Sequence, residues 1–246
     1  MTATEPPAPK ADSICLFLDV DGTLIDLAPT PGAVVVARAL LDELAQADRR
    51  LGGALALVSG RPIAALDELF APLRLRASGV HGAEIRYAPE GPTRSLTTAR
   101  LPDGAWDDLA RALARFPGAF AENKGVSFAV HYKLAGPIEA ELFAELERLR
   151  RRFGQLDLEV IPGNLVFEIK LPGFDKGAAI RRFMGRAPFA GRRPVFIADD
   201  RMDGPGFEAV LEMGGIAFSV GFEMAGLTGS FSEPAGVRAW LGKVTG

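Results

Sequence analysis

The sequence is poor in cysteine and lacks any long apolar run. Cys15 is the only cysteine among 246 residues, so an internal disulfide is excluded. It lies in the apolar segment Ile14-Cys15-Leu16-Phe17-Leu18, and we interpret it as a small core residue rather than a nucleophile. No stretch reaches the ~18 apolar residues of a membrane span, and residues 1–12 have no apolar segment of the kind found in signal peptides. We expect a cytoplasmic protein with a disordered leader at 1–12.

The sequence also lacks a strong charge of either sign. It has 28 basic and 31 acidic side chains, which give a formal net charge of -3. This balance argues against the basic footprint of a nucleic-acid-binding protein and against the basic stripe that binds an anionic membrane. A small phosphorylated molecule can still bind where positive charges are local. The hydrophobic content of 48% is sufficient for a substantial core, and the length fits one large or two small domains. For the oligomeric state, we favour a monomer.

Both ends of the chain alternate between buried strands and helices. Continuous apolar runs are typical of parallel strands covered on both faces, and they predict strands at 13–18, 54–58, 194–198 and 216–220. A weaker strand pattern predicts a further strand at 76–80. Apolar residues at helical spacing, together with turn signals, predict helices at 33–50, 62–70, 176–184, 207–212 and 234–241. This alternation predicts an α/β fold built on a parallel sheet.

The middle of the chain has a different pattern. Amphipathic helices are predicted at 103–116 and 138–153, and alternating polar and apolar residues predict half-buried strands at 127–132, 158–161 and 165–169. The segment Pro162-Gly163-Asn164 is a hairpin signal between the last two strands. We therefore predict an inserted α+β domain with an antiparallel sheet at 101–172, and a core formed by 13–100 and 173–246.

Acidic residues cluster where predicted core strands end. Asp19 and Asp21 directly follow the first strand, and Asp199, Asp200 and Asp203 follow a later one. Ligands bind at the carboxyl ends of strands in open α/β sheets, and paired carboxylates repel unless a cation or proton lies between them. Mg²⁺ prefers such oxygen ligands together with phosphate oxygens. A turn at Asp21-Gly22 with Asp19 as a helix cap explains the first pair alone, but not the second cluster.

Two further motifs provide groups that can bind an anion. Ser59-Gly60 ends the second predicted strand, and its hydroxyl and backbone N–H groups at a helix start form an anion site. Lys176 opens a predicted helix after Pro172-Gly173-Phe174-Asp175. Taken singly, this lysine is equally well explained as a surface residue.

The order of these motifs resembles the haloacid dehalogenase (HAD) superfamily of phosphohydrolases. Further segments resemble the trehalose-6-phosphate phosphatases within it, and these are His81-Gly82-Ala83-Glu84, Glu122-Asn123-Lys124-Gly125, His131-Tyr132 and Gly173-Phe174-Asp175-Lys176-Gly177. The resemblance extends from residue 14 to about residue 210. It implies a Rossmann-like core with a parallel sheet and a smaller inserted α+β cap domain, and it implies a phosphatase that acts on a small sugar phosphate.

The resemblance also implies roles for the core residues. Asp19 is expected to attack phosphorus and form an aspartyl-phosphate intermediate, which splits one difficult step into two easier ones. Asp21 is expected to protonate the leaving sugar oxygen and then to activate water. Lys176 is expected to neutralise Asp19 and the phosphate, and Ser59 to donate a hydrogen bond to the phosphate.

The metal implied by the resemblance is Mg²⁺. Its expected ligands are an oxygen of Asp19, the backbone carbonyl of Asp21, and Asp199. Asp203, and also Asp200, are expected to support these ligands from behind. For the sugar, the expected cap residues are Glu122, Lys124 and Glu168, and the expected core residues are Gly60, Arg61 and His81. Glu122 and Lys124 are also compatible with a solvated turn, and the nearby His131 with an ordinary sheet residue.

One segment departs from the family pattern. Relatives usually have Gly-Asp-Asp-x-Thr-Asp-Glu, whereas this chain has Ala198-Asp199-Asp200-Arg201-Met202-Asp203-Gly204. Met202 offers no hydroxyl, and Gly204 offers no carboxylate. Two alternatives to trehalose 6-phosphate hydrolysis therefore stay open. One is a related phosphatase acting on sucrose phosphate or mannosyl-3-phosphoglycerate, and the other is a non-catalytic sugar-phosphate sensor.

Overall fold

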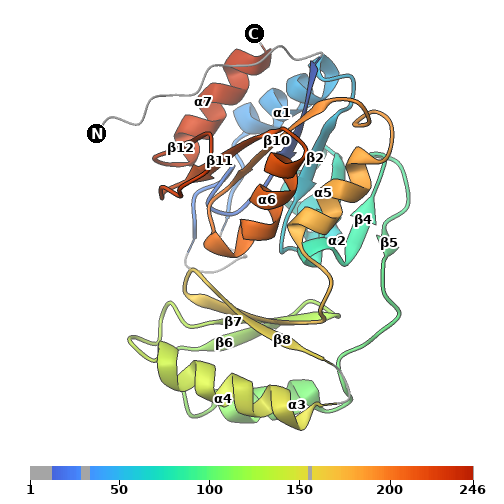
Figure 1. Cartoon of the computed structure of the whole chain (residues 1–246). Helices are drawn as coiled ribbons and strands as arrows, with labels where there is room; N and C mark the ends of the chain where they lie inside the picture. Colours follow the sequence, from blue (N-terminus) through green and yellow to red (C-terminus); the bar gives the residue numbers. More distant parts are fainter. Residues whose placement is uncertain (1–12, 29–33, 155–156, 246) are drawn as a thin grey trace. The chain divides into compact units, whose positions relative to one another are not determined.

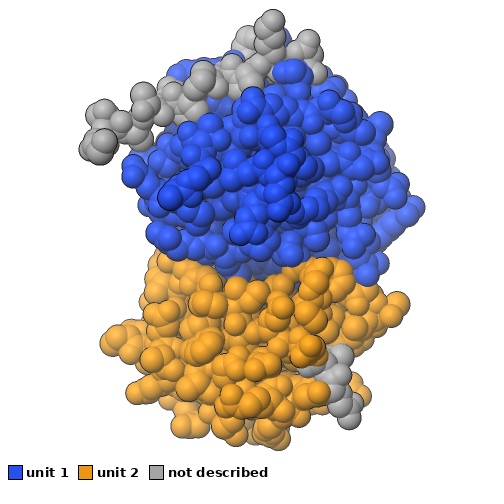
Figure 2. All heavy atoms as spheres, in the orientation of Figure 1, with its two compact units in different colours: residues 1–96, 175–246 blue, residues 97–174 orange. Residues whose placement is uncertain are grey.

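The computed structural model describes residues 13–28, 34–154 and 157–245. It divides into two compact units, which we call unit 1 (residues 1–96 and 175–246) and unit 2 (residues 97–174) (Figure 2). The division lies a few residues from the predicted boundaries after 100 and after 172. The predicted leader at 1–12 lies outside the described residues.

Unit 1 is built on an eight-stranded sheet with the order β12-β11-β10-β1-β2-β3-β4-β5 (Figure 1). All neighbours from β12 to β3 are parallel, whereas β4 and β5 are added antiparallel at one edge. This confirms the predicted α/β class with a parallel sheet. The strands are β1 (Ile14–Leu18), β2 (Leu55–Val58), β3 (Arg76–Gly79), β4 (Glu84–Arg86), β5 (Arg94–Ser95), β10 (Arg193–Ala198), β11 (Ile216–Val220) and β12 (Gly229–Phe231).

The central strands of this sheet are buried on both faces, as their continuous apolar runs predict. Every residue of β1 and β2 is buried, and Phe17 stacks on Phe189 with ring centroids 5.2 Å apart. Cys15 is buried in this core, and burial raises the pKa of its thiol to about 12. The helices of the unit are α1 (Arg38–Arg50), α2 (Ile63–Leu69), α5 (Lys176–Met184), α6 (Gly204–Glu212) and α7 (Pro234–Thr245).

Some predicted element boundaries were wrong. The predicted helix at 33–50 begins only at Arg38, because the run Val34-Val35-Val36 consists of β-branched residues that disfavour a helix. In contrast, α6 begins three residues earlier than predicted, at Gly204, because Pro205 is well suited to the first turn of a helix. The short strands β4, β5 and β12 were not predicted, because two or three residues are too few to show a period.

Unit 2 has a four-stranded antiparallel sheet with the order β6-β7-β9-β8. Its strands are β6 (Phe120–Asn123), β7 (Ser127–His131), β8 (Glu159–Gly163) and β9 (Val166–Lys170), and its helices are α3 (Ala105–Leu113) and α4 (Glu139–Arg152). The predicted hairpin is present, but its turn is Asn164-Leu165, with Leu165 at a positive φ of 58°, rather than Pro162-Gly163-Asn164.

One face of the unit 2 sheet packs against its two helices. Phe128 and Phe167 point to this face and form a core with Leu109 and Leu146 from the helices. Because side chains alternate along a strand, the residues that directly precede and follow these phenylalanines on β7 and β9 project from the other face of the sheet. Within the described ranges, none of the helices in either unit has both the length and the apolar character needed to cross a lipid bilayer.

Candidate active site

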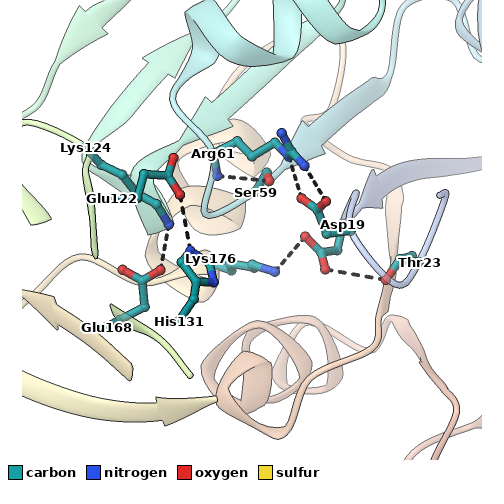
Figure 3. Close-up of polar contacts among 10 residues, drawn as sticks. Asp19, Thr23, Ser59, Arg61, Glu122, Lys124, His131, Glu168 and Lys176 are labelled. Carbon is teal, nitrogen blue, oxygen red and sulfur yellow. Dashed lines mark hydrogen bonds and ion pairs between the residues drawn. The ribbon is translucent and has the colours of Figure 1, made fainter. Parts of the chain in front are cut away.

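A buried ion-pair cluster lies at the carboxyl end of β1. Lys176 Nζ is 2.8 Å from Asp19 Oδ1 (Figure 3). It is also 2.8 Å from Asp203 Oδ1. All three side chains are buried. Burial alone lowers the pKa of Lys176, but the two adjacent carboxylates outweigh burial and raise it. The lysine is therefore a fixed positive charge beside Asp19, which rules out the surface interpretation.

Local sequence explains how Lys176 and Asp19 reach this position. Asp175 is the N-cap of α5 and accepts a hydrogen bond from the Ala178 N–H at 2.7 Å, so the helix begins at Lys176 and its side chain leaves the first turn. Asp19 directly follows β1 and accepts a hydrogen bond from Thr23 Oγ1 at 3.4 Å. Thr23 was not predicted as a site residue, although its place in the Asp19-to-Thr23 motif was a signal.

The turn after Asp19 brings the backbone against Asp199. Gly22 has a positive φ of 72°, and its N–H donates to the Ile25 carbonyl at 2.8 Å. A Cβ on Gly22 would lie 1.9 Å from Asp199 Oδ2, so only glycine fits beside this carboxylate. The turn therefore holds Asp19 and Asp199 close together from two neighbouring parallel strands.

Three carboxylates at this position form a candidate metal centre. Oxygen atoms of Asp19, Asp199 and Asp203 all lie within 4.8 Å of one another. Burial and the nearby Asp19 raise the pKa of Asp199 to about 9, and the same causes raise the pKa of Asp203 to about 7. Asp203 Oδ2 is buried and has no hydrogen-bond partner among the described residues. Crowded, buried carboxylate oxygens of this kind fit a divalent cation such as Mg²⁺.

The Asp21 side chain is held by Arg61 rather than by this cluster. Arg61 Nε and Nη2 donate to Asp21 Oδ2 and Oδ1 at 2.6 and 2.7 Å, which is a bidentate ion pair (Figure 3). The Asp21 carboxylate is not among the three clustered carboxylates. Its predicted role as a metal ligand involved only the backbone carbonyl, which this geometry does not test.

The predicted anion loop lies beside the same strand end. Ser59 Oγ accepts a hydrogen bond from the Arg61 N–H at 3.1 Å, and this bond closes a tight turn within the loop. The imidazole of His81 packs on Gly60, where an added Cβ would lie 2.6 Å from Nε2. The structure thus brings Ser59, Gly60, Arg61 and His81 together in unit 1.

The predicted cap residues also lie together, within unit 2. Lys124 Nζ is 2.6 Å from Glu168 Oε1, and both side chains are largely buried (Figure 3). Glu122 and Glu168 flank Ala129 on adjacent strands, so the two carboxylates share the sheet face away from the helices. His131 Nε2 is 3.4 Å from Glu122 Oε2, and this contact lowers the pKa of Glu122. His131 therefore contacts the polar group, and this contact is equally compatible with a hydrogen-bonded residue of the sheet.

The unusual segment 198–204 makes defined contacts. The Asp200 side chain accepts a hydrogen bond from the Met202 backbone N–H at 3.0 Å, and Asp203 binds Lys176. Gly204 begins α6. Neither a hydroxyl at 202 nor a carboxylate at 204 takes part in the contact between Asp203 and Lys176.

Comparison with known proteins identifies similar sequences. The sequence model of a protein family described as trehalose-phosphatase matches residues 17–229. A probable trehalose-phosphate phosphatase of Sinorhizobium fredii is 40% identical, and the match covers 85% of this chain and 78% of that protein. Trehalose-6-phosphate phosphatase of Escherichia coli K12 is 38% identical, with 93% of this chain and 85% of that protein covered.

Solved structures show the same fold. A crystal structure of a protein described as related to trehalose-6-phosphate phosphatase superposes with a TM-score of 0.79 at 25% identity, covering 95% of this chain and 97% of that one. The C-terminal domain of trehalose-6-phosphate phosphatase from Candida albicans superposes with a TM-score of 0.85 at 19% identity, covering 95% and 93% of the two chains. A third neighbour, from Bacteroides thetaiotaomicron, is described as a phosphatase of the HAD superfamily; its TM-score is 0.59 at 15% identity, over 96% and 95% of the chains.

Proposed function

Because the chain belongs to the trehalose-phosphatase family, we propose that it is a Mg²⁺-dependent phosphatase that hydrolyses trehalose 6-phosphate to trehalose and inorganic phosphate. The observation that carries the proposal is the buried contact of Lys176 with Asp19 and Asp203. Asp19, which the proposal assigns as the nucleophile, lies there beside a fixed cation and further carboxylates. Phosphoryl transfer needs little more than such positioned charges.

The proposed reaction has two steps. In the first, an Asp19 oxygen attacks phosphorus, the bond from phosphorus to the sugar oxygen breaks, and Asp21 gives its proton to that oxygen. In the second, Asp21 takes a proton from water, which attacks phosphorus and releases phosphate and the Asp19 carboxylate. A sugar alkoxide is a poor leaving group, so its protonation is a large part of the rate enhancement.

The arrangement of Asp21 supports this assignment of roles. Arg61 holds both oxygens of its carboxylate and so gives the side chain a defined position, and one of these oxygens must leave Arg61 before it can carry the proton that Asp21 donates. About a third of the Asp21 side chain is exposed, whereas Asp19 is buried against Lys176. Of the two aspartates in the motif, Asp21 is thus the one with access to a leaving group and to water.

Charge on the phosphoryl group is balanced by groups of this chain. Lys176 faces Asp19 and is fixed by Asp203, so it can offset the charge that develops on the transferring oxygens. Ser59 can donate its hydroxyl hydrogen to a phosphate oxygen while its oxygen keeps the hydrogen bond from Arg61. Mg²⁺ would be held by Asp19, Asp199 and the Asp21 carbonyl, and its charge would shield the phosphoryl oxygens.

In the proposed function, unit 2 acts as a cap that recognises the disaccharide. Glu122, Lys124 and Glu168 provide carboxylate and ammonium groups that suit sugar hydroxyls. Closure of a cap over a substrate excludes water and completes the site. Recognition by unit 2 is therefore expected to distinguish trehalose 6-phosphate from other phosphate esters.

Phosphate release from a panel of sugar phosphates tests this function. We expect turnover of trehalose 6-phosphate with Mg²⁺ and its loss with a chelator, and much weaker turnover of sucrose phosphate and mannosyl-3-phosphoglycerate. Preference for either of the latter would contradict the substrate assignment. Tight binding of trehalose 6-phosphate without any turnover would instead support a sensor, although the intact Lys176 contacts argue against this outcome.

Substitution of Lys124 tests the role of unit 2. Lys124→Ala removes the proposed charge-assisted hydrogen bond to a sugar hydroxyl, which would be worth ~1.5–3 kcal/mol, so we expect KM for trehalose 6-phosphate to rise roughly 10- to 100-fold. The rate with p-nitrophenyl phosphate, which has no sugar, should change by less than about threefold. Lys133→Ala, which removes an exposed lysine of the same unit, is the matched control. An equal loss with both substrates would remove Lys124 from sugar recognition.

A further inference from the structure

The loop that carries Ser59 and Arg61 is held by the neighbouring segment 78–81. The Ser59 N–H donates to the Ser78 carbonyl at 2.9 Å, the Val80 N–H donates to the Arg61 carbonyl at 3.0 Å, and the His81 N–H donates to the Ser59 carbonyl at 3.1 Å. Hydrogen bonds thus join the two segments at both ends of the Ser59–Arg61 loop.

This arrangement depends on an unusual backbone turn. Val80 and His81 have positive φ angles of 47° and 52°, which are uncommon for any residue except glycine and exceptional for a β-branched valine. Residues in such conformations persist where the surrounding structure determines them, and they gather at functional sites. Here the turn directs two successive N–H groups towards the Ser59–Arg61 loop.

Glu84 holds the other end of the same loop. Its Oε2 accepts a hydrogen bond from the Ile63 N–H at 2.8 Å. Ile63 is the first residue of α2, and the N-cap residue Pro62 has no side-chain group that could accept this bond. The first N–H groups of a helix need an external acceptor, and a carboxylate is favoured there. Glu84, which lies 21 residues away in sequence, provides that acceptor.

Close contacts around Glu84 restrict the position of its carboxylate. Gly79 pairs with Glu84 across β3 and β4, and a Cβ on Gly79 would lie 2.7 Å from the Arg61 carbonyl oxygen and 3.0 Å from Glu84 Oε2. Ser78 Oγ donates to the Glu84 carbonyl at 2.8 Å, which fixes the start of β4. The carboxylate of Glu84 is therefore placed against the last residues of the Ser59–Arg61 loop.

A second residue of β4 holds the far end of α2. Arg86 is almost completely buried, and its guanidinium donates to both oxygens of Asp67 at 2.6 Å and to the Leu75 carbonyl. Glu84 and Arg86 are two residues apart and so project from the same face of β4. The short strand β4 thus binds α2 near both of its ends.

We propose that Glu84 is a positioning residue for the reaction, a role that rests on the proposed function. By accepting the Ile63 N–H, Glu84 fixes the start of α2 and thereby the placement of Ser59 Oγ and of the Arg61 guanidinium on Asp21. Displacement of such groups by about 1 Å costs roughly 100-fold in rate, because the reacting atoms lose their alignment. Glu84 itself touches neither phosphate nor sugar in this role.

Kinetics of Glu84 variants test the proposal. Glu84→Met removes the acceptor, and we expect kcat for trehalose 6-phosphate to fall roughly 10- to 100-fold with a smaller change in KM. Glu84→Gln keeps an acceptor oxygen at the same reach and should stay within about threefold of the wild type. Glu84→Asp keeps the charge but shortens the reach, and should be impaired. Glu68→Met removes an exposed glutamate from α2 itself and is the matched control.

Hydrogen exchange gives a readout that needs no turnover. In Glu84→Met and Glu84→Asp the Ile63 amide should exchange at least about tenfold faster, and in Glu84→Gln at nearly the wild-type rate. If Glu84→Met fails to fold, the comparison of Glu84→Asp with Glu84→Gln decides. Unchanged Ile63 exchange, equal impairment of the Gln and Asp variants, or normal kcat in Glu84→Met would each overturn the proposal. A wild-type protein without turnover would contradict the proposed function, and the Ile63 exchange would still test Glu84.

Discussion

Asp19→Asn should abolish phosphate release while leaving the fold intact. The amide of asparagine is not a nucleophile, so no aspartyl-phosphate can form, and loss of an enzyme nucleophile lowers kcat by about 10⁴-fold or more. The substitution is nearly isosteric. The asparagine oxygen can accept from Lys176 in place of Asp19 Oδ1, and the NH2 group can donate to the Thr23 hydroxyl in place of Oδ2. It also removes one charge from a crowded group of carboxylates, so we expect little loss of stability.

The measurement is single-turnover phosphate release, with thermal unfolding followed in parallel. Asp26→Asn is the matched control, because Asp26 follows the same turn but its side chain is 77% exposed. The control should retain wild-type kinetics. If Asp19→Asn keeps a rate within about tenfold of the wild type, then Asp19 is not the nucleophile. If it has no activity and is also unfolded, a test of trehalose 6-phosphate binding by Asp19→Ala replaces it.

Strong local signals allowed much of unit 1 to be predicted from the sequence. Helix α5 has the predicted bounds, because Asp175 is a good N-cap and the apolar spacing after it is regular. Strands β1 and β11 were predicted to within one residue, because each is a continuous apolar run between polar turns. The helix and the strands depend on residues close together in the sequence, so intrinsic propensity and the apolar pattern are sufficient to predict them.

The features that were not predicted depend on residues far apart in the sequence. The bidentate contact between Arg61 and Asp21 joins positions 40 residues apart, and the contact of Glu84 with the Ile63 N–H joins positions 21 apart. Neither leaves a local periodic signal, because an isolated arginine or glutamate is equally compatible with a solvated surface. The resemblance to known phosphatases predicts that Arg61 lies near the substrate, but its contact with Asp21 is seen only in the folded structure.

The clustered carboxylates include one contact that the sequence predicted and others that it did not. That Asp19 and Asp199 lie together was expected, because both follow parallel strands and such ends meet at one edge of the sheet. No pattern in the sequence indicated that Asp203 contacts Lys176 or that its second oxygen is buried without a partner among the described residues. The missing threonine and glutamate at 202 and 204 suggested a weakened loop, yet the contact of Asp203 with Lys176 needs neither of them.

Lys176→Met should impair both turnover and stability. Methionine fills a similar volume, but Asp19 and Asp203 then lose the buried cation that lies 2.8 Å from each. Removing one partner from a buried ion pair typically costs about 3–5 kcal/mol, and we expect a loss of about 3 kcal/mol in the free energy of unfolding. The rate should fall by at least about 10³-fold, because the charge on the transferring phosphoryl group is no longer balanced.

Denaturation in urea, with and without Mg²⁺, distinguishes this explanation from a simple packing defect. A divalent cation bound by Asp19, Asp199 and Asp203 would replace part of the positive charge that these carboxylates lose with Lys176. Mg²⁺ should therefore stabilise Lys176→Met more than it stabilises the wild type. Arg182→Met, which removes an exposed positive charge from the same helix, should respond to Mg²⁺ as the wild type does. If Mg²⁺ stabilises none of the three proteins, the three carboxylates do not form the metal centre. If Mg²⁺ stabilises the wild type but does not reduce the stability loss of Lys176→Met, the lysine and the cation do not neutralise the same carboxylates.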